Sequence, residues 1–107
     1  MSENDREATR FYDSQRERLL GDPSISEKKM FGTTAMCVDG KVFMFAWKDV
    51  LVLKIPADRV EALVAAGDGE LFDPGHGRTS KTWVALYPTA GGQWERLADE
   101  ARAFVRQ

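Results

Sequence analysis

Apolar residues recur at helical spacing in three stretches of the chain, and each stretch predicts an amphipathic helix. The first covers residues 3–20, the second begins at Pro56 and ends near Gly67, and the third covers residues 91–107. The positions expected to face inward are Ala8, Phe11, Tyr12 and Leu19 in the first helix, Ala57, Val60, Leu63 and Val64 in the second, and Trp94, Leu97, Ala98, Ala101, Phe104 and Val105 in the third.

Residues 28–55 have the alternation of β-strands and predict an antiparallel meander of about four strands. Asp39-Gly40 lies between two apolar runs and signals a two-residue type I′ hairpin turn, and Lys48-Asp49 predicts a second turn. An antiparallel sheet with one wet face alternates apolar with polar residues, whereas the strand between these turns is apolar throughout. We therefore expect both faces to be covered, by helices on one side and by loops, a helix edge or a second subunit on the other. Strict alternation groups Phe43, Phe45 and Trp47 on one face and Val42, Met44 and Ala46 on the other.

The predicted order of elements is α-β-β-β-β-α-β-α, which is typical of a two-layer α+β domain with three helices and an antiparallel sheet of about five strands. A chain of 107 residues predicts a single domain, 1–107. Its expected parts are an N-terminal helix and connection (1–26), a β-meander (27–55), a helix (56–67), a glycine-rich loop (68–81), a strand (82–87) and a C-terminal helix (91–107).

The glycine-rich loop is the first candidate site. Glycine amides can form a concave nest for an anion, arginine and lysine supply positive charge, and histidine can donate a proton near neutral pH. The alternative is a scaffold loop, in which the glycines permit a tight path and the cations pair with neighbouring acids. The candidate anion or partner contacts are Gly75, His76, Gly77, Arg78 and Lys81.

Composition narrows the function classes. The net charge is −2 and the sequence pI is about 5.4, so no global basic field would attract nucleic acid or anionic lipid. No apolar run approaches the ~20 residues that span a bilayer, and the N-terminus lacks the apolar core of a signal peptide. We expect a cytoplasmic protein that does not enter membranes. With one cysteine and one histidine, the sequence predicts neither a disulfide nor a common metal site.

Candidate chemistry is sparse. Cys37 and His76 are the only residues that could form a thiol–imidazole pair, and Cys37 lies in an apolar strand, where a buried inert thiol is the usual outcome. The sequence therefore predicts no catalytic residue, no cofactor and no enzyme. The strand aromatics could stack bases only if basic residues were interleaved with them, and Lys41 and Lys54 stand at strand ends. Core packing is the favoured interpretation of those rings.

Several short motifs, taken in their order and spacing, carry a family likeness. They are Met30-Phe31-Gly32, the Asp39-Gly40-Lys41 hairpin, the strand end LKIP and the segment FDPGHGRTSKTWV. Across residues 28–106 the chain resembles the TfoX N-terminal domain family, known also from the Sxy competence regulators and related to the YjbR-like proteins. The resemblance implies a small α+β fold similar to that of secretion chaperones. It also implies a regulatory role and supplies no catalytic residue or cofactor.

Three functions are open at this point. The favoured one is a non-catalytic regulatory or interaction module that acts through protein contacts, with a homodimer as one expectation. The first alternative is a nucleic-acid-binding module in which Arg78, Lys81 and the strand-end lysines meet phosphates. The second is a binder of a small anion or ligand through the Gly75–Gly77 loop.

Overall fold

A six-stranded antiparallel sheet organises the fold. The computed structural model describes residues 3–30, 32–48, 50–72 and 81–106. Its helices and strands are α1 (Glu3–Leu19), β1 (Ile25–Met30), β2 (Thr33–Val38), β3 (Lys41–Trp47), β4 (Val50–Lys54), α2 (Ala57–Ala65), β5 (Gly69–Leu71), β6 (Trp83–Leu86), the 3-10 helix η1 (Pro88–Gln93) and α3 (Trp94–Arg106). The predicted α+β class and order of elements are confirmed, with six strands rather than about five.

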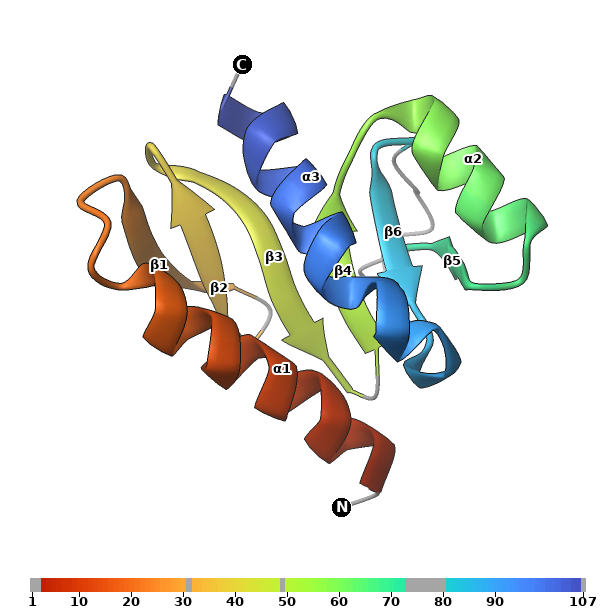
Figure 1. Ribbon diagram of the computed structural model, residues 1–107, viewed down its shortest axis with the longest axis horizontal. Helices are drawn as coiled ribbons and strands as arrows, with labels where there is room; N and C mark the ends of the chain where they lie inside the picture. The colour runs from red at the N-terminus through yellow and green to blue at the C-terminus, as the bar shows by residue number, and fades with distance from the viewer. Residues whose placement is uncertain (1–2, 31, 49, 73–80, 107) are drawn as a thin grey trace.

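The additional strand is β5, which lies in the stretch predicted as loop. The sheet order is β1-β2-β3-β4-β6-β5, so β6 pairs with β4 and β5 forms an edge (Figure 1). Three residues are too few for an alternation signal. The pairing depends on Gly69, where an added Cβ would lie 2.5 Å from the Ala85 carbonyl oxygen. This close approach of two backbones depends on the tertiary structure, so the pattern of residues along the chain does not predict it.

The predicted hairpin turn between β2 and β3 is confirmed. Asp39 has φ 51° and Gly40 has φ 81°, so both central residues are left-handed as a type I′ turn requires. Gly67, just after α2, also has a positive φ of 80°. Glycine adopts this conformation without the steric penalty of a Cβ, which explains why the helix ends there.

The face assignment along β3 is wrong for Val42 and Phe43 and is confirmed from Met44 to Trp47. The pairing of β2 with β3 shifts register between Met36 and Cys37, and β3 carries one extra residue at this point. This β-bulge brings Phe43 and Met44 into the same core cluster, beneath the helices. Strict alternation fails because a bulge turns two consecutive side chains toward one face. The opposite side of β3 holds Val42, Phe45 and Trp47.

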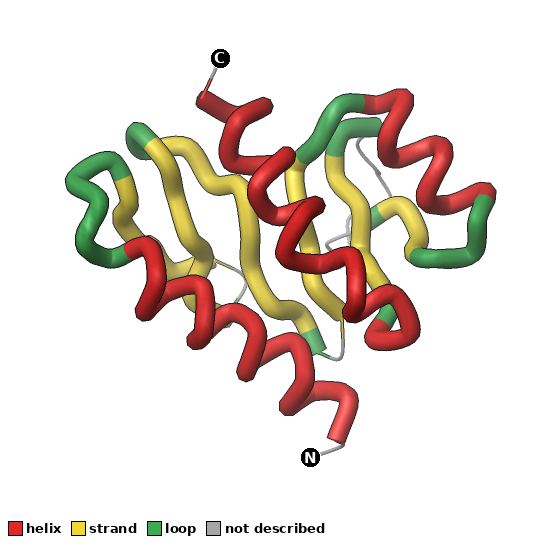
Figure 2. The backbone as a smooth tube through the Cα atoms, in the orientation of Figure 1, coloured by secondary structure: helices red, strands yellow, loops and turns green. Residues whose placement is uncertain are grey.

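The helices pack on one side of the sheet, which we call the helix face, and Val60 and Leu63 of α2 belong to the same core as the inward residues of α1 and α3. Figure 2 shows α1 and α3 crossing this side together, while α2 lies beyond them near β5 and β6. The predicted inward positions of α1 and α3 are confirmed as buried or partly buried. In α2 only Val60 and Leu63 are buried; Ala57 and Val64 are exposed, contrary to the prediction. The helix sits at the margin of the sheet, so only a narrow stripe of it meets other side chains.

The opposite side, which we call the far face, has its own smaller core. Phe45 and Val52 are fully buried there, and Phe72 is 7% exposed. The Phe72 ring packs edge-on against Phe45 and Trp47, with centroids 5.4 and 5.7 Å apart. The prediction that β3 is covered on both faces is therefore confirmed within one chain, and Phe72 contributes to the cover.

Candidate functional site

The predicted loop site falls mainly outside the described residues. Gly75, His76, Gly77 and Arg78 lie in 73–80, so the anion-nest and scaffold interpretations both stay hypotheses. Lys81 is described and is exposed. Its side chain lines a groove between α2 and β5, together with mostly aliphatic side chains.

That groove, which we call the α2–β5 groove, has a volume of about 460 Å³. Val64 of α2 is 38% exposed and Leu71 of β5 is 41% exposed, and both line it. Glu61 and Lys81 place one charge of each sign on its margin. The other described residues of the lining are aliphatic.

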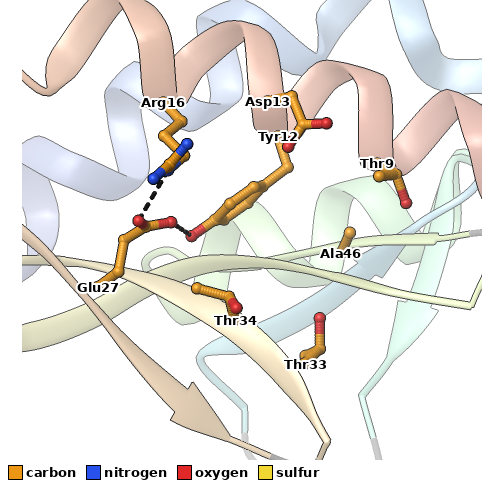
Figure 3. A pocket seen from close by; sticks show the side chains of 8 residues that line it. All are labelled: Thr9, Tyr12, Asp13, Arg16, Glu27, Thr33, Thr34 and Ala46. Carbon is orange, nitrogen blue, oxygen red and sulfur yellow. Dashed lines mark hydrogen bonds and ion pairs between the residues drawn. The ribbon is translucent and has the colours of Figure 1, made fainter.

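A second hollow, of about 290 Å³, lies between α1 and the first strands. Tyr12 and Arg16 extend from α1 and meet Glu27 of β1 (Figure 3). The Tyr12 hydroxyl donates to one Glu27 oxygen at 2.5 Å, and Arg16 Nε donates to the other at 2.8 Å. Glu27 points toward the helices because its register partner, Met36, belongs to the core of the helix face. We call these three residues the α1 clamp.

The pKa shifts in the α1 clamp follow from burial and from its hydrogen bonds. Burial, together with the hydrogen bond to Glu27 and its negative charge, raises the pKa of Tyr12 above its ordinary value, so the phenol stays protonated. Burial alone would raise the pKa of Glu27, but the hydrogen bonds from Tyr12 and Arg16 and the arginine charge outweigh it and lower that pKa. A neutral phenol and a paired carboxylate are poor nucleophiles. Their geometry fastens α1 to the sheet.

Sequence reasoning missed the α1 clamp because spacing along a helix indicates only partners three or four positions away. Arg16 instead pairs with Glu27, and Arg18 reaches Glu95 and Asp99 of α3 at 3.3 and 3.1 Å. The one available signal was a glutamate inside a predicted strand next to a helix that carries tyrosine and arginine four residues apart. Its partners are not local, so spacing along the chain does not identify them.

A third hollow, of about 700 Å³, gathers three of the chain's lysines, and we call it the lysine hollow. Lys28 of β1, Lys41 of β3 and Lys54 of β4 line it together with Trp83, Val42 and Phe104. Lys54 Nζ lies 5.7 Å from the centroid of the Trp83 ring. The sequence placed Lys41 and Lys54 apart from the aromatics, at strand ends, whereas in the structure both line one hollow with Trp83, and Lys54 lies next to its ring.

Cys37 is buried, and burial raises the pKa of its thiol, so the thiolate form is disfavoured. Within 3–30, 32–48, 50–72 and 81–106, no group of three histidine, cysteine or carboxylate residues could hold a metal ion. Across the same ranges, no helix is both long and apolar enough to cross a bilayer.

In a comparison with protein families, the model of the TfoX N-terminal domain matches residues 17–107. The matched segment contains all six strands, α2 and α3, and the last residues of α1. A comparison with curated proteins finds no match.

Proposed function

This chain belongs to the TfoX N-terminal domain family, and we propose that it is a non-catalytic interaction module that acts by contact with another protein. The observation that carries the proposal is the α2–β5 groove. Among the described residues, three large apolar side chains are exposed, and two of them, Val64 and Leu71, line this groove. Neighbouring exposed aliphatic side chains in a concave surface are typical of a contact site for a partner.

The size of the groove favours a modest, reversible contact. Complete burial of an aliphatic side chain contributes roughly 1.5–3 kcal/mol, and Val64 and Leu71 are already more than half buried. Covering them adds about 1 kcal/mol each. Glu61 and Lys81 on the margin supply orientation more than affinity, since exposed charges contribute little. A second copy of the chain or a different protein would both satisfy this chemistry.

The test compares a variant with substitutions in the groove and a variant with a substitution at an exposed leucine outside it. The variant Val64→Glu/Leu71→Glu places charge in the groove, and Leu20→Glu does the same at a residue that is 47% exposed outside it. We expect the double variant to lose self-association in sedimentation velocity, or the partners recovered by affinity capture, while Leu20→Glu retains them. Circular dichroism checks that both variants fold. Equal binding by wild type and both variants contradicts the proposal.

The absence of catalysis is part of the same proposal. It is supported by the buried thiol of Cys37 and by the structural pairing of Tyr12 and Glu27. Turnover of a substrate by the purified protein, lost on substitution of Cys37 or His76, would contradict it. A regulatory, cytoplasmic role agrees with the family likeness and is tested by where a tagged copy localises.

Nucleic-acid binding is a second candidate because Lys28, Lys41 and Lys54 line one hollow that also contains Trp83. Affinity for a single strand would then fall with salt at a log–log slope of about 0.7 per phosphate contact.

Binding of a small anion by the Gly75–Gly77 loop is a further hypothesis. Isothermal titration with inorganic phosphate, repeated on Arg78→Gln, tests it.

A further inference from the structure

The lysine hollow shares no lining residue with the α2–β5 groove among those described, so it is a separate surface. It forms where β3 begins and β4 ends, near the last turns of α3. Lys28 and Lys54 pair in register with Ala35 and Trp83, which places both lysines on the far face. Lys41 pairs with Val38 on the helix face. The hollow therefore wraps around the end of the sheet, and positive charge approaches it from three strands.

No ion pair within the described part of the chain engages these three lysines. Every ion pair found among the described residues uses an arginine, and none uses a lysine. Asp39, next to Lys41 in the hairpin turn, is engaged by Arg106 at 3.3 Å. No carboxylate lines the hollow within the described part of the chain. Three like charges around one concavity repel one another, and an anionic ligand would relieve that repulsion.

The rest of the lining is apolar. Val42 and Phe104 are each partly buried and belong to the margins of the far-face and helix-face cores. A ligand that fills this hollow would bury their remaining surface while its acidic groups meet the lysines. We propose that the lysine hollow binds an acidic segment of a partner protein whose carboxylates alternate with apolar anchor residues.

A nucleic acid fits the hollow less well than such a segment. Base stacking requires an open aromatic face. The Trp83 ring already contacts the Lys54 ammonium at 5.7 Å and the Phe45 ring at 5.8 Å between centroids. Lysines offer carboxylates compact point charges with freely rotating donors, which suits an irregular acidic peptide.

Two triple variants that remove the same charge make a matched experiment. The hollow variant is Lys28→Gln/Lys41→Gln/Lys54→Gln. The control variant is Lys29→Gln/Lys48→Gln/Arg10→Gln, at exposed residues that line neither the lysine hollow nor the α2–β5 groove. The probe is a fluorescein-labelled eight-residue peptide of alternating glutamate and leucine, measured by anisotropy against the full chain. A peptide with glutamine in place of glutamate and an eight-nucleotide thymidine strand serve as comparison probes.

We expect the glutamate peptide to bind the wild type, to lose about tenfold in affinity on the hollow variant, and to stay within about twofold on the control variant. Amide shifts in an NMR titration should centre on Val42 and Trp83. The proposal is overturned by absence of binding at millimolar peptide, by equal losses in both variants, by equal binding of the glutamine peptide, or by tighter binding of the thymidine strand. None of these outcomes involves Val64 or Leu71, so failure here leaves the proposed function of the α2–β5 groove standing.

Discussion

α1 and α3 both pack on the helix face, but different interactions hold them there. α3 presents a continuous apolar stripe to the sheet, with Trp94, Leu97 and Ala101 nearly or fully buried. Among the side chains of α1 whose burial is described, four are buried, and one of them is the polar Gln15. The α1 clamp fastens this helix to β1, and Arg18 links it to α3. Most of α1 also precedes residue 17, where the family match begins.

This difference indicates which helix should respond to solution conditions. Burial of apolar surface depends little on pH, whereas a carboxylate that is paired only when α1 is docked makes that docking depend on pH. Substitutions in either helix test this difference. Substitutions in α3 should weaken the whole fold, whereas substitutions in the α1 clamp should loosen α1 first.

The largest expected effect is that of Leu97→Ala. Leu97 is fully buried, and its truncation leaves a cavity, so we expect a loss of about 2–5 kcal/mol in the free energy of unfolding. Urea denaturation followed by tryptophan fluorescence measures it. Leu20→Ala is the control, because Leu20 is 47% exposed and should change stability by less than about 0.5 kcal/mol. Similar losses for the two leucines would show that α3 is not held by burial.

An intermediate effect is expected from Glu27→Gln. This change removes the charged acceptor of the Tyr12 hydrogen bond and should cost about 1–2 kcal/mol, because Arg16 is half exposed and adds little. Hydrogen exchange should quicken in the α1 amides before those of α3. Asp13→Asn is the control, since Asp13 lines the same hollow and is exposed. Exchange that quickens equally in both helices would contradict the distinction between them.

The stabilisation that Glu27 contributes should also depend on pH. The pKa of Glu27 is lowered in the folded protein, so its stabilisation is fully present above the ordinary glutamate pKa of about 4.3 and is lost as the pH falls through the folded value. The stability difference between wild type and Glu27→Gln should therefore shrink on going from pH 7 to pH 3. Denaturation of both proteins at the two pH values measures it, and a constant difference would exclude the α1 clamp as the cause.

The smallest effect is expected from Arg18→Gln. Arg18 bridges α1 to Glu95 and Asp99 of α3, but its side chain is 44% exposed, and exposed ion pairs contribute less than about 1 kcal/mol. Salt at 0.5 M should remove most of the difference from wild type. A loss as large as that from Leu97→Ala would mean that the two helices are joined mainly to each other.

The success of sequence reasoning varied with the range of the interactions involved. The apolar stripes of α1 and α3 and the Asp39-Gly40 turn were predictable, because helical period and left-handed turn residues act over a few positions. β5, the exposure of α2 and the position of Phe43 were not. A close approach at Gly69 and a β-bulge both depend on the strand alongside. Of the predicted contact residues, only Lys81 lies in the described part, and it lines a surface the sequence did not indicate.

The amino-acid sequence by itself determined the α+β class, the order of helices and strands and the family of this protein, because period, turn chemistry and motif order are properties of neighbouring residues. Only the tertiary structure decided that Glu27 meets Tyr12, that three lysines from separate strands share one hollow, and that Val64 and Leu71 line another. These groups are brought together by strand register and helix docking, which arise from the packing of the whole chain rather than from any one segment of it.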